Sequence, residues 1–222
     1  MPRLPLDPQE FRKRLADYRT GSEQAIRDLQ ADRGEEATCP ATNAFFRKAL
    51  EDRRFRKGLD LGCHTGAFGG EVLSPLCENL TLVDFSEKAL QAALDRLPRA
   101  HGLRADLARE WPKVKALGRF DLVSLCEVIQ HMPGAEDREA VFRAAAGMLE
   151  PGGVLLFSTY FMREGEPPEG FFHSELHPHL LFYHRSGEEE NQKRFRRASL
   201  KILERFREER VDAFVLAPRG SP

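Results

Sequence analysis

The feature that most constrains the fold of this chain is a regular alternation of short hydrophobic runs with helix-like segments between residues 58 and 160. Short apolar runs predict buried strands, and the segments between them carry apolar side chains at helical spacing. Helices that alternate with strands connect parallel neighbours and cover both faces of the sheet. The sequence therefore predicts an α/β fold with a doubly wound, mostly parallel sheet of about seven strands and helices on both faces. The expected strands are GLDLG (58–62), LTLVD (80–84), GLRAD (102–106), FDLVSLCE (120–127), VLLFSTY (154–160), LLFYH (180–184) and VDAFVLAP (211–218).

The remaining segments predict helices and one long connection. Ser86 precedes a run with Ala/Leu periodicity and is expected to cap its helix. Residues 1–56 are expected to form an N-terminal helical cap on a domain spanning 57–222, in which 160–210 holds a substrate lid and a charged helix. The expected helices cover residues 8–33, 41–52, 67–77, 86–97, 137–149 and 188–209.

The composition disfavours some classes of partner. Lys plus Arg (34) nearly balance Asp plus Glu (35), so no global field attracts nucleic acid or a membrane surface. The N-terminus lacks an apolar signal core, and no run of 18 apolar residues occurs. The four cysteines form no CxxC pair, which favours reduced thiols in the cytoplasm over a cysteine zinc site.

A cluster of glycines follows the first expected strand. The stretch GLDLGCHTGAFGG places five glycines between Gly58 and Gly70. A glycine-rich turn at the carboxyl end of a strand lets the backbone approach a ligand. The dinucleotide fingerprint G-x-G-x-x-G is absent, and the pattern is Asp60-x-Gly62-x-x-x-Gly66. A carboxylate at Asp60 repels a pyrophosphate but pairs with an ammonium, so dinucleotide binding is disfavoured.

From Gly58 to about residue 217 the chain resembles the class I S-adenosylmethionine-dependent methyltransferases, which have a Rossmann-like fold. Each matching motif is weak alone, but five in the expected order and spacing form a specific signal. They are LDLGCHTG, TLVDFS, RADL, FDLVSLCEVIQHMP and LEPGGVLLFSTY.

The resemblance implies roles for individual residues toward S-adenosylmethionine. Asp60 would orient the cofactor's amino group, and Asp84 would accept both ribose hydroxyls. Asp106 would accept from the adenine amino group. For each carboxylate the structural alternative is a turn or capping residue. The full set of implied cofactor-binding residues is Asp60, Gly62, Cys63, His64, Gly66, Asp84, Phe85, Ala105, Asp106, Leu107 and Cys126.

His64 departs from the commonest family pattern, which has glycine at that position. A side chain is tolerated there when φ is negative. Two roles remain open for His64: a hydrogen bond to the cofactor's carboxylate, and a solvent-facing position in the loop.

The catalytic candidates follow the fourth strand. In such methyltransferases the segment after the fourth strand lies beside the cofactor's methyl group. The resemblance therefore implies that Glu127 and His131 lie on the rim beside that methyl group. An imidazole with an ordinary pKa near about 6.5 can deprotonate a hydroxyl or amine at neutral pH, with Glu127 holding the ring in one tautomer. The structural alternative is that His131 only packs against a helix or loop.

The chain is not expected to bind a metal tightly. The E-x-x-E-H arrangement that some quinone-type O-methyltransferases use for a divalent metal occurs here as Glu127-x-x-Gln130-His131, without the middle carboxylate. Four histidines follow the fifth strand, and a histidine-rich substrate lid is favoured over a metal site. The substrate candidates are Tyr18, His173, His177 and His179; packing in the core is the alternative for Tyr18.

These patterns favour an enzyme that methylates an oxygen or a nitrogen of a small molecule. Methylation of RNA or protein is an alternative, and a non-catalytic S-adenosylmethionine-binding domain is another. The basic residues of 188–209 are interleaved with glutamates, which is typical of a solvated helix face rather than an RNA-binding surface.

Overall fold

The computed structural model describes residue 9 and residues 39–173, 180–208 and 210–220. The predicted helix at 8–33, and with it Tyr18, lies outside these ranges. The elements in order are α3 (Pro40–Ala49), β1 (Phe55–Leu61), η2 (Gly69–Leu73), β2 (Cys77–Asp84), α4 (Glu87–Arg96), β3 (His101–Arg104), α5 (Trp111–Lys115), β4 (Phe120–Cys126), η3 (Ile129–His131), α6 (Ala135–Gly147), β5 (Leu149–Tyr160), β6 (Glu169–His173), β7 (Leu180–His184), α7 (Glu188–Arg197), β8 (Leu200–Glu208) and β9 (Val211–Pro218).

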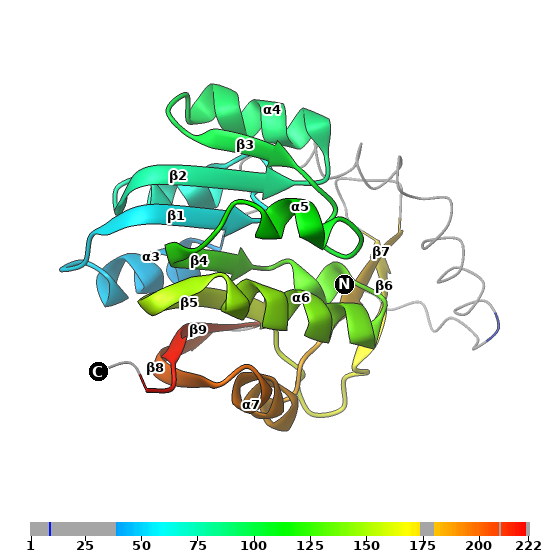
Figure 1. Cartoon of the computed structure of the whole chain (residues 1–222). Coiled ribbons are helices and arrows are strands. Elements are labelled where there is room, and N and C mark those ends of the chain that lie inside the picture. Colours follow the sequence, from blue (N-terminus) through cyan, green and yellow to red (C-terminus); the bar gives the residue numbers. More distant parts are fainter. Residues whose placement is uncertain (1–8, 10–38, 174–179, 209, 221–222) are drawn as a thin grey trace.

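A seven-stranded sheet forms the centre of the molecule, with strand order β3-β2-β1-β4-β5-β9-β8. The strands from β1 to β5 run parallel, and β9 and β8 continue the sheet antiparallel (Figure 1). The predicted doubly wound, mostly parallel α/β fold is confirmed. β6 and β7 form a separate two-stranded hairpin.

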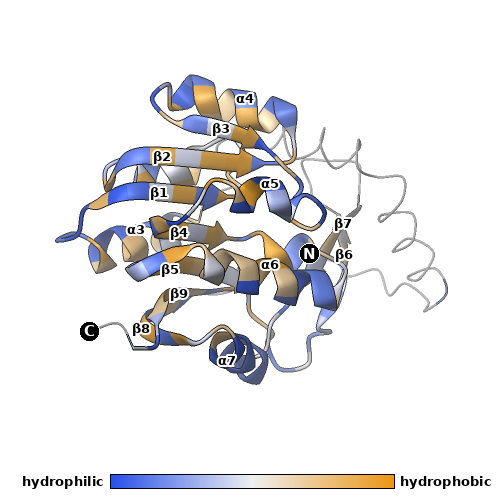
Figure 2. Ribbon diagram, viewed as in Figure 1, coloured by the Kyte–Doolittle hydropathy of each residue, from blue (hydrophilic) through white to orange (hydrophobic). Residues whose placement is uncertain are grey.

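Helices cover both faces of the sheet, because side chains along each strand alternate between two apolar cores. One core packs Leu59, Val123 and Phe157 of the sheet against α5, α6 and α7. The other packs Leu82 and Leu156 against α3, η2 and α4. In Figure 2 the apolar colour is concentrated along the central strands, while α7 is strongly hydrophilic.

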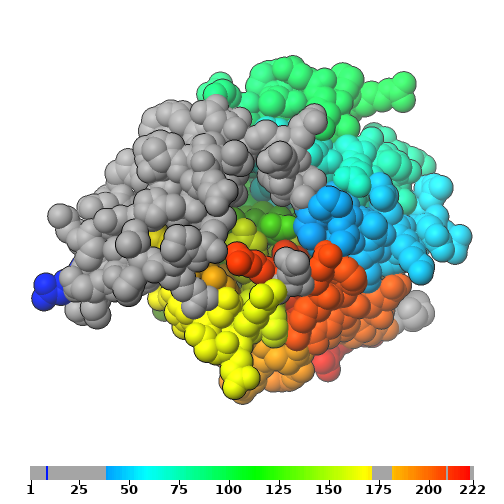
Figure 3. All heavy atoms as spheres, turned by 180° about the vertical axis from the view of Figure 1, so that it is seen from behind, coloured from blue at the N-terminus to red at the C-terminus, as the bar shows by residue number. Residues whose placement is uncertain are grey.

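The segment predicted as an N-terminal cap shares this second core in its described part. Phe46 of α3 and Leu50, the residue that follows the helix, are almost fully buried in it. Figure 3 shows α3 beside β8 on one face of the molecule, where Phe45 stacks on Phe206 with ring centroids 5.4 Å apart. The domain boundary expected between residues 56 and 57 falls within β1.

Several local features match the sequence prediction. The Ser86 side chain accepts a hydrogen bond from the Ala89 N–H at 3.2 Å and caps α4. The predicted helix at 67–77 is shorter, with a π-helical turn, η2, before β2 begins at Cys77. The sequence prediction did not include α5 and β6.

The prediction of one long charged helix over 188–209 is wrong in its second half. α7 ends at Arg197, Ser199 adopts φ +54°, and β8 then pairs antiparallel with the buried strand β9. The side chains of β8 follow the period of a strand: Arg205 and Arg207 reach Asp212, while Phe206 on the other face meets α3. Pairing with β9 outweighs the helical pattern of charges.

None of the helices formed by the described residues is both long enough and apolar enough to span a membrane.

Candidate functional site

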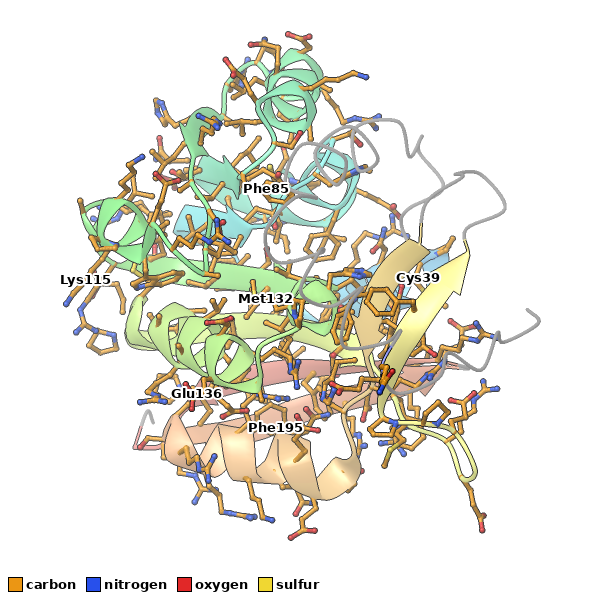
Figure 4. The ribbon with its side chains drawn as sticks, turned by 90° about the vertical axis from the view of Figure 1, so that its right-hand side faces the viewer. Cys39, Phe85, Lys115, Met132, Glu136 and Phe195 are labelled. Carbon is orange, nitrogen blue, oxygen red and sulfur yellow. The ribbon has the colours of Figure 1, made fainter. Side chains whose placement is uncertain are left out.

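A cavity of about 700 Å³ lies at the carboxyl ends of the parallel strands. β1 and β4 are neighbours, and the chain proceeds from this pair outward in both directions, so the cavity lies where the strand order switches. Figure 4 views this edge, with Phe85, Met132 and Cys39 contributed by three different parts of the chain. The lining residues are Cys39, Thr42, Asn43, Gly62, Cys63, His64, Ala67, Phe68, Asp84, Phe85, Ala105, Asp106, Leu107, Ala108, Arg109, Cys126, Glu127, Val128, His131, Met132, Pro133, Gly134, Ala135, Glu136, Asp137, Ser158 and Tyr160.

The cavity brings together nine of the eleven residues expected to bind a cofactor, and both catalytic candidates. Asp60 and Gly66 are the two expected cofactor-binding residues that do not line it. Sequence reasoning missed the contributions of α3, of residues 132–137 and of Ser158 and Tyr160. Ser158 and Tyr160 could have been predicted, because they lie two positions apart near the carboxyl end of a strand that the sequence already indicated.

The turn after β1 requires its glycines. Gly62 has φ +77°, and a Cβ there would lie 2.5 Å from Cγ2 of Val128. Gly66 has φ +75°, and its Cβ would lie 3.0 Å from the Ala93 backbone. The N–H groups of Gly62 and Cys63 both donate to the carbonyl oxygen of Val83, at 2.7 and 3.1 Å. The turn is therefore fixed against β2, and the absence of a side chain at Gly62 keeps the wall of the cavity open.

His64 adopts φ +49°, which corrects the expectation of a negative φ at this position. Histidine is among the residues that enter the left-handed region more readily than most. The conformation directs the His64 N–H to Oδ2 of Asp84 at 2.9 Å, and the residue lines the cavity. The backbone geometry is thus the one that glycine supplies in the commonest family pattern.

Asp84 ends β2 and presents a nearly buried carboxylate to the cavity. Its oxygens accept from the N–H groups of His64 at 2.9 Å and Ser86 at 2.8 Å. Burial raises the pKa of Asp84, and these backbone donors act in the opposite direction by stabilising the charged form. The carboxylate is held rigidly, and its remaining lone pairs can accept from a ligand.

Asp60 lies beneath the glycine turn and accepts a hydrogen bond from the Ser124 hydroxyl of β4. Its Oδ2 is buried and has no hydrogen-bond partner in the described part of the chain. Burial raises the pKa of Asp60 to about 7; the Ser124 bond lowers it and the charge of Asp84 raises it. A direct contact between Asp60 and a ligand stays a prediction, since Asp60 does not line the cavity.

Phe85, Asp106 and Leu107 follow the ends of β2 and β3 and line the part of the cavity expected to meet a flat ring. Oδ1 of Asp106 accepts from the Ala108 N–H at 2.9 Å, so this carboxylate also shapes its own turn. Arg109 was not predicted and also lines the cavity.

The two cysteines expected at the cofactor also line the cavity, but their environment keeps them protonated. Burial is the main cause that raises the pKa of both Cys63 and Cys126 well above the usual thiol value. A thiol is a poor nucleophile, so both act as apolar wall residues.

The rim after β4 carries Glu127 and His131. Glu127 has φ +55°, and its N–H donates to the Ser158 carbonyl at 3.0 Å. Nδ1 of His131 lies 3.0 Å from the carbonyl oxygen of Phe182, and the ring meets Tyr160 edge-on at 5.8 Å. A carbonyl can only accept, so Nδ1 carries the proton. The tautomer is therefore set by a main-chain carbonyl of β7, where the sequence suggested Glu127.

The β6–β7 hairpin occupies the region predicted as a histidine-rich lid. His184 of β7 is buried and lies 3.0 Å from Glu190 of α7, which also accepts from Arg194 at 2.8 Å. Burial alone would raise the pKa of Glu190, but the hydrogen bond from His184 and the charges of His184 and Arg194 lower it to about 2. His184 therefore joins β7 to α7.

The other histidines of that region cannot be placed at the cavity. His173 ends β6, and His177 and His179 lie outside the described residues. The described residues contain no group of three or more His, Cys, Asp or Glu side chains arranged to hold a metal. Gln130 is fully buried and does not line the cavity, so it is not positioned to complete a metal site with Glu127 and His131.

Comparison with known proteins finds a matching family model and relatives of similar sequence. Residues 59–155 match the family model described as "Methyltransferase domain". The chain is 32% identical over 111 residues to a ubiquinone biosynthesis O-methyltransferase of Bordetella avium, covering 47% of this chain and 42% of that protein. It is 30% identical over 117 residues to nodulation protein S of Bradyrhizobium diazoefficiens, covering 51% and 54%. The chain thus spans about half the length of these relatives.

Solved structures show the same fold. An S-adenosylmethionine-dependent methyltransferase from Clostridium acetobutylicum superposes with a TM-score of 0.66 at 16% identity, covering 89% of this chain and 99% of that one. The N-methyltransferase NodS from Bradyrhizobium japonicum, in complex with S-adenosyl-L-homocysteine, superposes with a TM-score of 0.60 at 21% identity, covering 93% and 96%.

The described residues share the Rossmann-like fold of these solved methyltransferases, with a cavity at the carboxyl ends of the parallel strands. Residues 59–155 are the part that matches the methyltransferase-domain model.

Proposed function

We propose that this protein transfers a methyl group from S-adenosylmethionine to an oxygen or nitrogen of a small-molecule acceptor. The observation that carries the proposal is the cavity wall itself. It combines a glycine turn, a buried carboxylate on β2 and a histidine on the β4 rim whose tautomer leaves the lone pair on Nε2. A wall of this composition suits a ligand with ribose hydroxyls at one end and a reacting group at the other.

The residues present fit the cofactor. The turn at Gly62 has no room for a Cβ, so the backbone itself forms the wall where the methionine part would lie. Asp84 offers a carboxylate to two hydroxyls. Asp60 does not line the cavity, but its buried Oδ2 has no hydrogen-bond partner among the described residues, and it would bind the cofactor's ammonium directly or through water. Phe85 and Leu107 would flank the adenine, with Asp106 beside its amino group.

When bound, S-adenosylmethionine supplies an electrophilic methyl carbon on a sulfonium sulfur. The protein then has to align the acceptor with that carbon and exclude water. Glu127, His131 and Tyr160 line the cavity and would do so.

His131 would act as the base for a hydroxyl acceptor. Because its Nδ1–H donates to the Phe182 carbonyl, Nε2 holds the lone pair that accepts the proton. The resulting imidazolium would keep its bond to the same carbonyl, so the ring does not have to turn during proton transfer. An amine that is already unprotonated would need only positioning.

Basic residues on α7 and β8 are already paired with carboxylates, which favours a small acceptor over RNA. Arg194 is buried and bonded to Glu139 and Glu190. Arg205 and Arg207 form ion pairs with the buried Asp212. Guanidinium groups that are already paired are poor partners for phosphates. A cytoplasmic location belongs to the proposal and is supported by the four unpaired cysteines.

The proposal is tested first by binding. Calorimetry should show that S-adenosyl-L-homocysteine binds to the full chain while NAD does not. A panel of small hydroxyl and amine acceptors, assayed with S-adenosylmethionine, then separates an enzyme from a domain that only binds. Binding of NAD without binding of S-adenosyl-L-homocysteine would reject the assignment.

A further inference from the structure

The stretch of chain from Phe182 to Ser186 connects two sides of the cavity rim. Its first part belongs to β7, which packs against η3, the turn that contains His131. The Phe182 carbonyl oxygen lies 3.0 Å from Nδ1 of His131. Beyond β7, the Ser186 N–H donates to the Tyr160 carbonyl at 2.8 Å, and the Met162 N–H donates to the Ser186 carbonyl at 3.2 Å. The stretch therefore runs from the rim after β4 to the rim after β5.

Strand pairing alone does little to fix this stretch. In the described part of the chain, β6 and β7 form a sheet of only two strands, so β7 pairs with a strand along one edge. The Phe182 carbonyl bonds to a side chain of η3. A two-stranded hairpin is marginally stable by itself. The position of this carbonyl therefore depends on side-chain contacts as well as on the strand.

Two side chains of the stretch are anchored to α7. Nε2 of His184 lies 3.0 and 3.1 Å from the two carboxylate oxygens of Glu190 and donates to them. Oγ of Ser186 accepts from Nη1 of Arg194 at 3.3 Å, and Ser186 is fully buried. These anchors lie two and four positions after Phe182. Glu190 and Arg194 therefore restrain the chain directly behind the carbonyl that His131 meets.

Arg194 joins the anchors into one buried network. Its side chain is 1% exposed, and each nitrogen of its guanidinium donates a hydrogen bond. Nε donates to Glu139 of α6 at 2.8 Å, Nη1 to Asn191 at 2.6 Å and Nη2 to Glu190 at 2.8 Å. Buried charges lose their hydration, so a network of this kind often adds no net stability over apolar packing and can instead specify one conformation. The conformation that this network specifies is that of the chain after Phe182.

We infer that Glu190 and Arg194 of α7 are positioning residues for His131. They hold the Phe182 carbonyl where it accepts from Nδ1, which leaves the lone pair on Nε2. The hydrogen bond that one imidazole nitrogen makes decides which nitrogen is protonated, and a carbonyl displaced by about 1 Å no longer makes that bond. The consequence for methyl transfer rests on the function proposed above, whereas the effect on the tautomer does not require it.

The test measures the tautomer of His131 in the full chain without a ligand. Nitrogen chemical shifts of the ring are recorded at about pH 8, where an ordinary imidazole is neutral. Glu190→Ala removes the acceptor of His184. Glu188→Ala is the matched control, because Glu188 lies on the same helix, has a similarly exposed side chain (44% against 37%) and pairs with two arginines of β8 instead of with β7.

We expect wild type and Glu188→Ala to show a protonated Nδ1. In Glu190→Ala the ratio of the two tautomers should shift about three- to tenfold toward protonated Nε2, the contribution of a neutral hydrogen bond. Glu190→Gln should restore most of the wild-type ratio, because its amide oxygen can still accept from His184. A purely structural role would lower the urea midpoint of Glu190→Ala and leave the ring of the folded protein unchanged.

Ser186→Ala removes the second anchor with the loss of a single oxygen atom. It should shift the ratio in the same direction, and it tests the inference if Glu190→Ala does not fold. A shift in Glu190→Ala with none in Ser186→Ala would overturn the role assigned to Arg194.

Turnover gives a second measurement. In Glu190→Ala, kcat for a hydroxyl acceptor should fall about two- to tenfold, because less of the ring has a bare Nε2 and the imidazolium loses its acceptor. KM and the affinity for S-adenosyl-L-homocysteine should stay unchanged, and Glu188→Ala should keep normal turnover. The inference is overturned if folded Glu190→Ala keeps the wild-type tautomer ratio, if Glu188→Ala shifts it equally, or if the wild-type ring is protonated on Nε2. If wild type methylates no acceptor, the proposed function fails, and the ring nitrogens still decide the inference.

Discussion

Nδ1 of His131 lies 3.0 Å from the carbonyl oxygen of Phe182, a residue 51 positions further along the chain. The bond joins the rim of the cavity to β7, whose last residue, His184, is in turn bonded to Glu190 of α7. The hairpin that sequence analysis placed over the substrate therefore also orients the candidate base. This relationship makes the role of His131 testable through its tautomer as well as through activity.

Replacement of His131 by alanine should lower the turnover of a hydroxyl acceptor by about 10²–10⁴-fold, the usual contribution of a general base. The affinity for S-adenosyl-L-homocysteine should stay nearly unchanged. The wild-type rate should fall in acid as Nε2 gains a proton, and the variant should lack that limb. Steady-state kinetics across pH, with the exposed His101→Ala as control, measure both effects. Normal turnover with an unchanged pH profile in His131→Ala would reject the base.

The tautomer itself can be measured without any acceptor. Nitrogen chemical shifts of the His131 ring should show a protonated Nδ1 and a bare Nε2 at neutral pH, because the Phe182 carbonyl can only accept. A ring protonated on Nε2 would contradict the arrangement and would remove His131 as the base in this state.

Asp60 should make the folded state less stable as pH rises. Burial raises its pKa to about 7, whereas in the unfolded chain it titrates near the ordinary 3.8. Between these values the folded state binds more protons than the unfolded state, so the stability that the neutral carboxyl contributes is lost as pH rises through about 7. Asp60→Asn removes this titration. Urea unfolding should show the variant gaining ~2–4 kcal/mol on wild type between pH 4 and pH 8, at about 1.4 kcal/mol per unit. A difference that does not change with pH would contradict the shift.

Asp84→Asn should weaken S-adenosyl-L-homocysteine by about 1.5–3 kcal/mol, because a hydrogen bond to a charged acceptor is lost. It should also lower stability, since the amide cannot accept from both His64 and Ser86. Asp121→Asn is a matched control. Asp121 accepts from two backbone N–H groups, those of Arg56 and Lys57, but lies at the start of β4 and away from the cavity. The control should lose stability and keep its affinity; an equal loss of affinity in both variants would show that only folding was affected.

The parts of the site that the sequence predicted are those made by residues close together in the chain. The turn at Gly62, the strand end at Asp84 and the segment from Asp106 to Leu107 each follow a recognisable strand, and parallel strands bring their carboxyl ends to one edge. The bond from His131 to Phe182 could not be predicted in this way. It joins a side chain to a main-chain carbonyl, and no residue type marks a carbonyl in the sequence.

The error over residues 200–208 has a related cause. The local sequence pattern of this segment has the mixed charge of a solvated helix, carried by Lys201, Glu204, Arg205 and Glu208. The deciding interaction is pairing with β9, a strand buried on both faces that would otherwise expose its outer edge. Tertiary pairing of this kind overrides a local propensity that is worth only tenths of a kcal/mol per residue.

The prediction that no metal is tightly bound remains to be tested. Gln130 supplies a neutral amide where the E-x-x-E-H arrangement has a carboxylate, and its buried side chain does not line the cavity. We expect elemental analysis to find less than about 0.1 equivalents of zinc, iron or nickel per chain, and EDTA to leave the rate unchanged; divalent sites need several hard or imidazole ligands. One equivalent of metal, or a rate abolished by EDTA and restored by magnesium, would overturn this.

The left-handed backbone at His64 leads to the last prediction. A non-glycine residue at φ +49° pays roughly 1 kcal/mol of steric strain, while glycine would add a similar conformational entropy cost on folding. The two terms oppose each other, so His64→Gly should change the free energy of unfolding by less than about 1 kcal/mol. His64→Val places a β-branched side chain in the same conformation and should lower it by about 1–2 kcal/mol more than His64→Gly. Urea unfolding of the two variants checks the order. If His64→Gly instead lowers the free energy of unfolding by clearly more than about 1 kcal/mol relative to wild type, the imidazole must contribute contacts that outweigh the strain, and its side chain rather than its backbone would then explain why histidine occupies this turn.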